Sequence, residues 1–488
     1  MKSEVLRMER VCCSDQGIVQ LDGFNLRILS SEITGLLLIN NHGLTSLLRL
    51  LQRNTPLRYG YVYYRGAQIN SWRAPKQRNN RIGLIQSESC LVGGLTVSDN
   101  IFVLRPDFRQ KLMRPSVFRK QLAPFLESIG IKISADAYVD ELTDFERVVV
   151  DILKSVMAGC KLIVLTDISA NICEAELVKI HQLLKRYAGE GISFLYIDYH
   201  FGELRQVCDN IALMSNGRIV KQMQSGELTP ESIDKYTLAY NEKIRRQIIL
   251  PAYEKNMRGT LFEIRDLTGE LIDGLSFSVS SGECVALQNV DEQVFGELLS
   301  MVGGATRPGR GEILIDGKPA SLCPDGEISI IQDLPTKTMI FNELSYFDNL
   351  CFLLDRRLPG IWRDDRLRAG VRREYAAILG EDVFDSRIDL LSETQKYYLV
   401  YTRVAIRRPK VVFCAQPFRR ADMELRMHIT GLMKMLLDKG VALVALAVNL
   451  ADCLPLADKL IRIRKDQPPE VYAREEFASA PVWEIPGG

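Results

Sequence analysis

The feature that most constrains the fold of this chain is an internal repeat. Two segments, LDGFNLRILSSE and IDGLSFSVSSGE, share a strand–turn–strand pattern, and their glutamates, Glu32 and Glu283, lie 251 positions apart. A nearly constant separation between many unlike residues indicates a tandem duplication, so one fold is built twice. Further pairs, at separations of 251 or 249, are Gly66 with Gly317, Asp99 with Asp348, Asn100 with Asn349, Leu142 with Leu391, Lys161 with Lys410 and Asp209 with Asp458.

Each copy mixes two kinds of strand with helices. Apolar runs without polar alternation, KLIVL and SFLYI in the first copy and KVVF and VALVALAV in the second, predict strands that are buried on both faces of a parallel sheet. Close turns at Gly60 and Gly311 indicate a smaller antiparallel sheet at the start of each copy. Arg-rich segments at 103–141 and 353–390 have a helical pattern. The predicted fold is α/β, with a mixed-sheet core, an antiparallel β subdomain and a helical subdomain in each copy.

The repeat also sets the expected domain boundaries. We expect a first domain at 1–239, a charged, proline-containing linker at 240–258 and a second domain at 259–488.

Composition narrows the class of protein. Hydrophobic residues (47%) and charged residues (25%) occur in the proportions of a globular protein. The net charge of +1 gives no overall attraction to nucleic acid, so no nucleic-acid partner is expected. The N-terminus carries charges of both signs and no apolar stretch is long enough to span a bilayer, which predicts a cytoplasmic chain. Eleven cysteines without a C-x-x-C pair and four scattered histidines show no zinc spacing and indicate buried, reduced thiols.

Two framework segments resemble those of a known family. LTVSDNIF and CDNIALMSNGRIV follow a glycine turn that precedes a helix, and in this order they resemble an ATP-binding cassette (ABC) protein. The tandem form is similar to the ATP-binding subunits of ribose-, galactose- and xylose-type importers. The resemblance implies ATP and Mg²⁺ as cofactors and membrane permease subunits as partners. It also implies a place in the cytoplasm, peripheral on the inner face of the membrane.

The phosphate-binding loop of the family, G-x-x-x-x-G-K-[ST], is altered in the first copy. Its glycines let backbone N–H groups converge on phosphate, and its lysine neutralises the outer phosphates. Here Leu38 replaces the first glycine and Leu44 replaces the lysine. A weak ATP site would use Asn41, Gly43, Thr45 and Ser46, with Thr45 on Mg²⁺. The alternative is a strand–turn–helix corner retained for packing.

The second copy departs further from the loop pattern. The segment from Asn289 to Gly296 lacks the loop glycines, and Phe295 stands at the position of the cation. Asp291 and Glu292 place negative charge where phosphate would bind, which disfavours a nucleotide. ATP and Mg²⁺ are therefore expected at the first site only.

Hydrolysis also needs a strand-end Asp for the metal and a Glu that polarises water. These positions are Thr166 and Asp167 in the first copy and Ala415 and Gln416 in the second. Asp167 is thus a candidate for metal binding and catalysis, with helix capping as the alternative.

The remaining contact positions are shifted or lost. The switch histidine of the family falls on Tyr199, with His200 beside it as a second catalytic candidate, and the glutamine expected at Ser87 stands at Gln86. The two signature segments, 142–146 and 391–395, lack their glycines. Ser392 is a candidate phosphate contact, and a helix cap without ligand is the alternative.

Three functions remain open from the sequence. The preferred one is a hydrolytically inactive or weak homologue that acts as a nucleotide-sensing, docking or regulatory subunit of a carbohydrate transport system. The others are a transport ATPase with drifted motifs, and a binding module outside transport that uses Arg-rich surfaces (363–373 and 403–408). Segments 89–95 and 336–341 are apolar enough to receive a permease. Pairing of the two copies within one chain, or of two chains, is expected.

Overall fold

A computed structural model describes most of the chain, and the predicted linker at 240–258 lies outside the described residues. The described residues are 3–15, 17–73, 80–86, 89–102, 131–224, 227, 259–289, 292–320, 327–352, 364–379, 383–450, 453–464 and 467–477.

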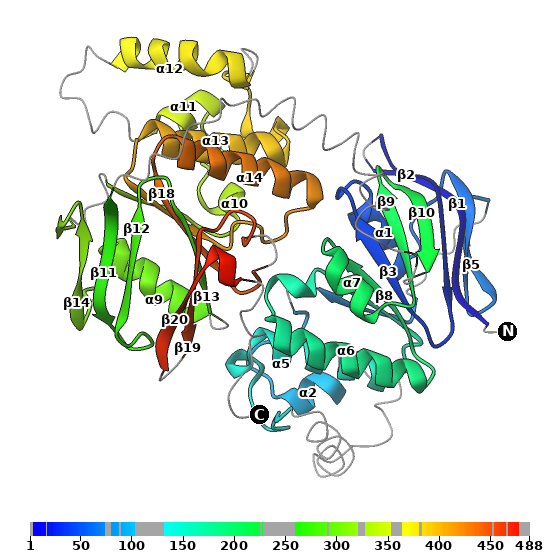
Figure 1. The fold of residues 1–488 in the computed structure, drawn as a ribbon. Coiled ribbons are helices and arrows are strands. Elements are labelled where there is room, and N and C mark those ends of the chain that lie inside the picture. The colour runs from blue at the N-terminus through cyan, green and yellow to red at the C-terminus, as the bar shows by residue number, and fades with distance from the viewer. Residues whose placement is uncertain are drawn as a thin grey trace. The chain divides into compact units, whose positions relative to one another are not determined.

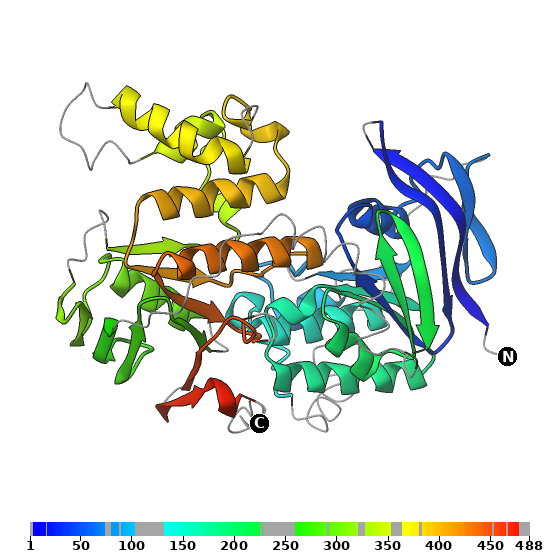
Figure 2. The same cartoon turned by 45° about the horizontal axis from the view of Figure 1, so that its top comes forward.

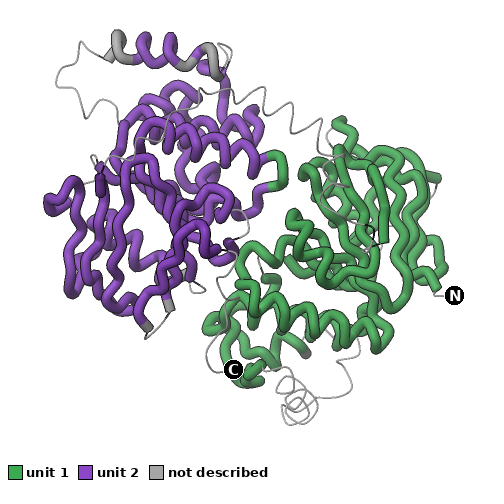
Figure 3. Tube along the Cα trace, in the orientation of Figure 1, with its two compact units in different colours: residues 1–241, 422–424, 481–488 green, residues 242–421, 425–480 purple. Residues whose placement is uncertain are grey.

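The chain divides into two compact units, shown in Figure 3. One comprises Met1–Asn241 with Asp422–Glu424 and Pro481–Gly488, and the other comprises Glu242–Ala421 and Leu425–Ala480. Figures 1 and 2 show that each unit contains two sheets with helices packed on them.

The first unit begins with an antiparallel sheet in the order β2-β1-β4-β5. Its second sheet has the order β10-β9-β3-β8-β7-β6, in which β10 is antiparallel to β9 and the other pairs are parallel. The strands are β1 (Glu4–Asp15), β2 (Ile18–Leu29), β3 (Ile33–Leu38), β4 (Tyr59–Tyr64), β5 (Ala67–Ser71), β6 (Ile82–Gln86), β7 (Leu162–Thr166), β8 (Ser193–Asp198), β9 (Asn210–Ser215) and β10 (Arg218–Gln224).

The second unit repeats this topology. Its antiparallel sheet has the order β12-β11-β14-β15, and its mixed sheet has the order β20-β19-β13-β18-β17-β16, which matches the first unit strand for strand. The duplication and the predicted fold class are confirmed. The strands are β11 (Thr260–Thr268), β12 (Leu275–Ser280), β13 (Cys284–Gln288), β14 (Arg310–Ile315), β15 (Lys318–Pro319), β16 (Ile328–Ile331), β17 (Val411–Ala415), β18 (Ala442–Ala447), β19 (Lys459–Arg464) and β20 (Gln467–Ala473).

The central strands are buried on both faces, as their continuous apolar runs predict. In β7, Ile163 and Leu165 pack into the core that includes the helices after β6 and β7, whereas Leu162 and Val164 pack into the core under the antiparallel sheet. Alternate residues of this strand therefore pack on opposite faces of the mixed sheet, one face toward the helices and the other toward the antiparallel sheet.

The helices of the first unit are α1 (Leu44–Gln52), α2 (Val97–Phe102), α5 (Asp144–Met157), α6 (Glu174–Gly189) and α7 (Phe201–Val207). Those of the second are α9 (Glu292–Val302), α10 (Pro335–Thr338), α11 (Tyr346–Cys351), α12 (Asp364–Leu379), α13 (Glu393–Ile406) and α14 (Met423–Asp438). The helical insertion predicted at 353–390 contains α12, whereas 103–130 of its counterpart lies outside the described residues. In the part of the chain that the structure describes, no helix is both long and apolar enough to span a membrane.

Candidate functional site

The corner between β3 and α1 in the first copy depends on a glycine. Gly43 caps α1 with a φ of 84°, in the left-handed region. A Cβ at this position would lie 2.3 Å from the carbonyl oxygen of Gln20. Any other residue would meet both the strain and the clash, so the chain can turn into the helix here only with glycine.

The polar side chains of the first corner are bonded to other parts of the protein. The Asn40 amide donates to Asn216 Oδ1 (3.0 Å), and His42 Nε2 lies 2.8 Å from the Val19 carbonyl oxygen. The Tyr199 hydroxyl donates to Asn41 Oδ1 over 2.6 Å. The structure therefore brings Asn41 together with Tyr199, the residue at the switch-histidine position.

His200 belongs to a different group of side chains. Its Nδ1 lies 3.2 Å from Asp198 Oδ1 and 3.4 Å from the Ser169 hydroxyl, which also donates to Asp198 Oδ2 over 2.7 Å. Burial raises the pKa of Asp198, but hydrogen bonds from His200 and Ser169 outweigh it, and the net shift is downward. His200 thus stabilises a fully buried carboxylate, an arrangement that fits a structural role.

Asp167 follows β7 in a strained backbone conformation. It is buried, its φ is 54°, and its N–H donates to the Ile197 carbonyl. Its side chain does not cap the short 3₁₀ helix Ile168–Ala170, which argues against the capping alternative. In the second copy Gln416 keeps the left-handed φ (40°) and the bond to the equivalent carbonyl, that of Leu446. Both copies therefore retain the strained strand end, although only the first retains a carboxylate.

The first turn of α1 holds the remaining candidates. Thr45 is exposed, Ser46 is half-buried, and Leu44 occupies the lysine position. The N-terminus of this helix fits an anion, but no cation stands at Leu44 to balance the outer phosphates. Among the described residues, no three His, Cys, Asp or Glu side chains gather as metal ligands. Mg²⁺ would therefore rely on the Thr45 hydroxyl and Asp167, together with ligands from outside the protein.

In the second copy the helix begins earlier than in the first, at the residues equivalent to the corner. The separation of 251 aligns Val294 with Gly43 and Phe295 with Leu44, and α9 begins earlier, at Glu292. Val294 and Phe295 are buried within α9, and Asp291 lies outside the described residues. Because Val294 disfavours the left-handed turn, the residues that form a loop in the first copy continue the helix. The part of the expected loop from Glu292 to Gly296 therefore lies within α9.

Side chains of the second copy bind each other around this corner. Glu297 of α9 accepts hydrogen bonds from the backbone N–H groups of Glu270 (2.5 Å) and Leu271 (2.8 Å) in the β11–β12 turn. The buried Arg462 guanidinium donates to Gln288 Oε1 over 2.9 Å at the end of β13. Glu297 and Arg462 are thus engaged with other parts of the second copy.

The signature segments serve as helix caps. Ser392 accepts a hydrogen bond from the Gln395 N–H, and Gln395 Oε1 accepts one from the Ser392 N–H. Thr143 and Glu146 form the same capping box at α5. The Ser392 hydroxyl therefore stabilises the start of α13, as the alternative to phosphate binding predicts.

A second pair of loops is built alike in both copies. Asn100, 2% exposed, accepts from the Val92 N–H (2.7 Å) and donates to the Val92 carbonyl (3.1 Å). Asn349 does the same for Phe341, at 2.9 and 2.8 Å. In each copy, therefore, one buried Asn side chain binds both the N–H and the carbonyl of one loop residue.

A cationic side chain from the next long helix also donates a hydrogen bond to the backbone of each loop. Lys154 of α5 donates to the Cys90 carbonyl over 3.3 Å, and Arg403 of α13 donates to the Met339 carbonyl over 2.5 Å. Burial, with a contribution from Arg407, lowers the pKa of Arg403 to about 10. Arg403, predicted above as part of an Arg-rich surface (403–408), is instead buried, and Lys154 was not predicted. The separation of 249 between the two residues was the signal that could have paired them.

These loops, which we call the docking loops (89–95 and 338–344), present apolar side chains to solvent. Val92 is 56% exposed and Phe341 is 41% exposed. Phe341 packs against Phe352, with 4.4 Å between ring centroids. Apolar side chains exposed in this way are available for a protein–protein contact.

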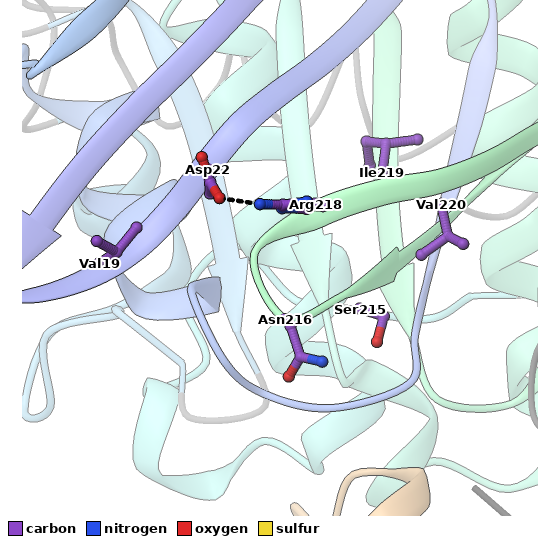
Figure 4. Close-up of a pocket in the computed structure, with 7 residues that line it drawn as sticks. All are labelled: Val19, Asp22, Ser215, Asn216, Arg218, Ile219 and Val220. Carbon is purple, nitrogen blue, oxygen red and sulfur yellow. Dashed lines mark hydrogen bonds and ion pairs between the residues drawn. The ribbon is translucent and has the colours of Figure 1, made fainter. Parts of the chain in front are cut away.

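A shallow hollow of about 540 Å³ flanks the first corner (Figure 4). It lies between β2 and the β9–β10 hairpin, and Asp22 forms an ion pair with Arg218 beside it. Its lining residues are Val19, Asp22, Ser215, Asn216, Arg218, Ile219 and Val220.

Comparison with known proteins agrees with this geometry. Residues 21–168 match the ABC transporter family model. A ribose import ATP-binding protein of Rubrobacter xylanophilus is 23% identical over 97% of this chain and 96% of its own length. A ribose/galactose/methyl galactoside import ATP-binding protein of Burkholderia cenocepacia, described as putative, is 22% identical over 94% and 90%. Among solved structures, an RNase-L inhibitor shares the fold with a TM-score of 0.59 at 12% identity, covering 95% of this chain and 90% of its own.

Proposed function

Because this chain is a tandem ABC protein, we propose that it is a docking and regulatory subunit of a carbohydrate import system, with little or no ATP hydrolysis of its own. The full-length similarity to import ATP-binding proteins of the ribose and galactose type supports the transport setting. A permease in the membrane is the expected partner, and the chain would lie in the cytoplasm against it.

The observation that carries this proposal is the likeness of the two docking loops. In each copy a buried Asn and a cation from a helix form hydrogen bonds to the loop backbone. Each loop exposes one apolar side chain, Val92 or Phe341. Four side chains, an Asn and a cation in each copy, hold the two docking loops in the same way. Because the two phosphate corners differ while these loops match, we infer that the loops serve a function that does not depend on the corners. Two apolar loops would each receive a helix of a permease.

The nucleotide part of the proposal concerns the first copy alone. ATP with Mg²⁺ supplies the phosphoryl chemistry in this family, and Gly43, Thr45 and Ser46 would hold its phosphates here, with Asp167 near the metal. The N-terminus of α1 and the left-handed turn at Gly43 support weak binding. Leu44 in place of the cation opposes turnover, since losing a cationic group in phosphoryl transfer costs about a thousandfold or more.

The docking part can be tested with the intact chain. The chain is co-expressed with the permease subunits of its own transport system, and its retention on the detergent-solubilised permease is measured. Val92→Asp and Phe341→Asp each place a charge in the proposed contact and should lower retention about tenfold or more.

Val178→Asp and Val471→Asp are matched controls, because these valines are similarly exposed (43% and 55%) outside the docking loops. They should leave retention unchanged. Equal retention of all four variants, or no retention of the unaltered chain, would contradict the proposal.

A further inference from the structure

Charge is distributed very unevenly between the two copies. Residues 33–87 contain eight Lys or Arg residues and no Asp or Glu. The equivalent segment of the second copy, 284–338, contains four basic and eight acidic residues. The net charge of +1 conceals this difference, so the absence of overall attraction to nucleic acid says nothing about one face of the first copy.

The antiparallel sheet of the first unit presents aromatic rings on its outer face. Along β4, Tyr59, Tyr61 and Tyr63 alternate with the buried Gly60 and Val62. Tyr59 is 44% exposed, and it lies beside Trp72, which is 38% exposed, with 5.8 Å between ring centroids. Tyr61 and Tyr63 are 6.4 Å apart in the same way. The rings of each pair are tilted to one another and in contact range, and the pairs lie on a solvent-facing surface where flat bases could lie against them.

Guanidinium groups accompany these rings. The Arg73 Cζ lies 5.0 Å from the Trp72 centroid, and the Arg7 Cζ lies 4.3 Å from the Tyr63 centroid. Arg58 directly precedes Tyr59 and is exposed. The two carboxylates near Arg7, those of Glu4 and Glu9, are already in ion pairs with it.

The same face of the second unit is built differently. Glu263, Arg265 and Glu312 form a ladder of ion pairs there, at 2.8 and 3.3 Å. Glu312 stands at the position of Tyr61. The aromatic and basic face is therefore specific to the first copy.

We propose that this face, defined by Arg7, Arg58, Tyr59, Tyr61, Tyr63, Trp72 and Arg73, binds single-stranded nucleic acid. Successive bases would stack on the rings while Arg58 and Arg73 contact the backbone phosphates, a combination typical of sequence-tolerant single-strand binding. Arg7, which is in ion pairs with Glu4 and Glu9, would line the face beside Tyr63. An acidic peptide would leave the rings without a role. A bilayer interface also accepts Tyr, Trp and Arg, but three outward tyrosines in a row along one strand suit successive bases, and vesicles serve as an arm of the test. This proposal goes beyond the proposed function and needs neither a permease nor ATP.

The test uses the full chain and a fluorescein-labelled oligouridine RNA of about 20 nucleotides, with binding followed by fluorescence anisotropy at several salt concentrations. Tyr59→Ala with Trp72→Ala should weaken binding about tenfold or more, because two stacking platforms are lost. Tyr59→Phe with Trp72→Phe keeps the rings and should retain the affinity. Arg58→Gln with Arg73→Gln should lower the slope of log K against log salt by about 1.4, since two phosphate contacts are removed.

The matched control removes two cations from the other unit. Arg265→Gln with Arg310→Gln changes the net charge equally and should leave binding and its salt slope unchanged. The proposal is overturned if the RNA does not bind at low salt, if the control weakens binding as much as Arg58→Gln with Arg73→Gln, or if the chain binds phosphatidylglycerol vesicles and not RNA.

Discussion

The two copies differ most at the strand–helix corner and least at the docking loop. At the corner, Gly43 turns the first copy into α1, whereas Val294 continues the helix in the second. At the docking loops, Asn100 and Asn349 make the same pair of bonds to the loop backbone. The two copies thus differ at the corner proposed to bind a nucleotide and agree at the surface proposed to contact a partner.

At each corner, the residue types agree with the point at which the helix begins. In the first, a left-handed residue forces the chain to leave the strand before the helix begins. In the second, a buried β-branched residue and an acidic first turn favour an earlier helix start. A change at one position therefore alters several backbone groups at once.

The largest expected effect comes from exchanging the corner residues. Gly43→Val should destabilise the first unit by about 2–4 kcal/mol, because valine meets both the left-handed strain and the Gln20 carbonyl. The reverse change, Val294→Gly, should cost about 1–2 kcal/mol through lost helix propensity and lost burial. Urea unfolding followed by hydrogen exchange in α1 and α9 measures both. Equal losses in the free energy of unfolding for the two variants would contradict the proposed difference between the corners.

The docking-loop asparagines should behave as a matched pair. Asn100→Ala and Asn349→Ala should each destabilise the surrounding unit by about 2–3 kcal/mol, because each leaves a loop N–H and carbonyl without a buried partner. Local hydrogen exchange of the two loops is the readout.

Asn25→Ala is the control for this pair. Asn25 also accepts from one backbone N–H and donates to one carbonyl, but on an exposed strand, so its loss should cost below about 1 kcal/mol. Unequal costs for Asn100 and Asn349 would show that only one docking loop is built as described.

The last effect depends on pH and distinguishes the two copies. Burial, assisted by Asp198, raises the pKa of Glu203 from 4.5 to about 7, and its Oε2 lies 3.9 Å from His181 Nε2. The positions equivalent to Asp198 and His181 in the second copy are Ala447 and Thr430. Because the folded chain holds this proton more tightly than the unfolded chain, stability should fall as pH rises from about 4.5 to about 7.

Glu203→Gln removes this loss. The variant should be more stable than the unaltered chain at pH 8, by up to about 3 kcal/mol, and similar to it near pH 4.5. Burial lowers the pKa of His181 to about 4, which acts in the opposite direction between pH 4 and 6.5 and remains in the variant. Urea unfolding at pH 5 and pH 8 checks the difference, and an equal gain at both values would contradict the assignment.

Periodicity and the constant separation predicted the fold well. Strands such as β7 are buried on both faces, and continuous apolar runs state this directly. The start of α9 was harder to predict, because Asp291 and Glu292 were interpreted as charges that repel phosphate. Acidic residues are also typical of the first turn of a helix, and Glu292 is the first residue of α9.

Side-chain partners were the least predictable part. The neighbours Tyr199 and His200 have different partners, Asn41 and Asp198 respectively. That Tyr199 would bond to the phosphate corner required the distance between β8 and the β3–α1 loop. Sequence spacing cannot supply a distance between segments more than 150 residues apart.

We propose above that this chain keeps partner docking with little or no ATP hydrolysis. The most direct test of this proposal is calorimetric titration of the purified chain with ATP and Mg²⁺, paired with a turnover assay on the same sample. The account predicts weak binding at no more than one site per chain, and no turnover above that of Asp167→Asn. Two sites per chain, or turnover that Asp167→Asn abolishes, would contradict it.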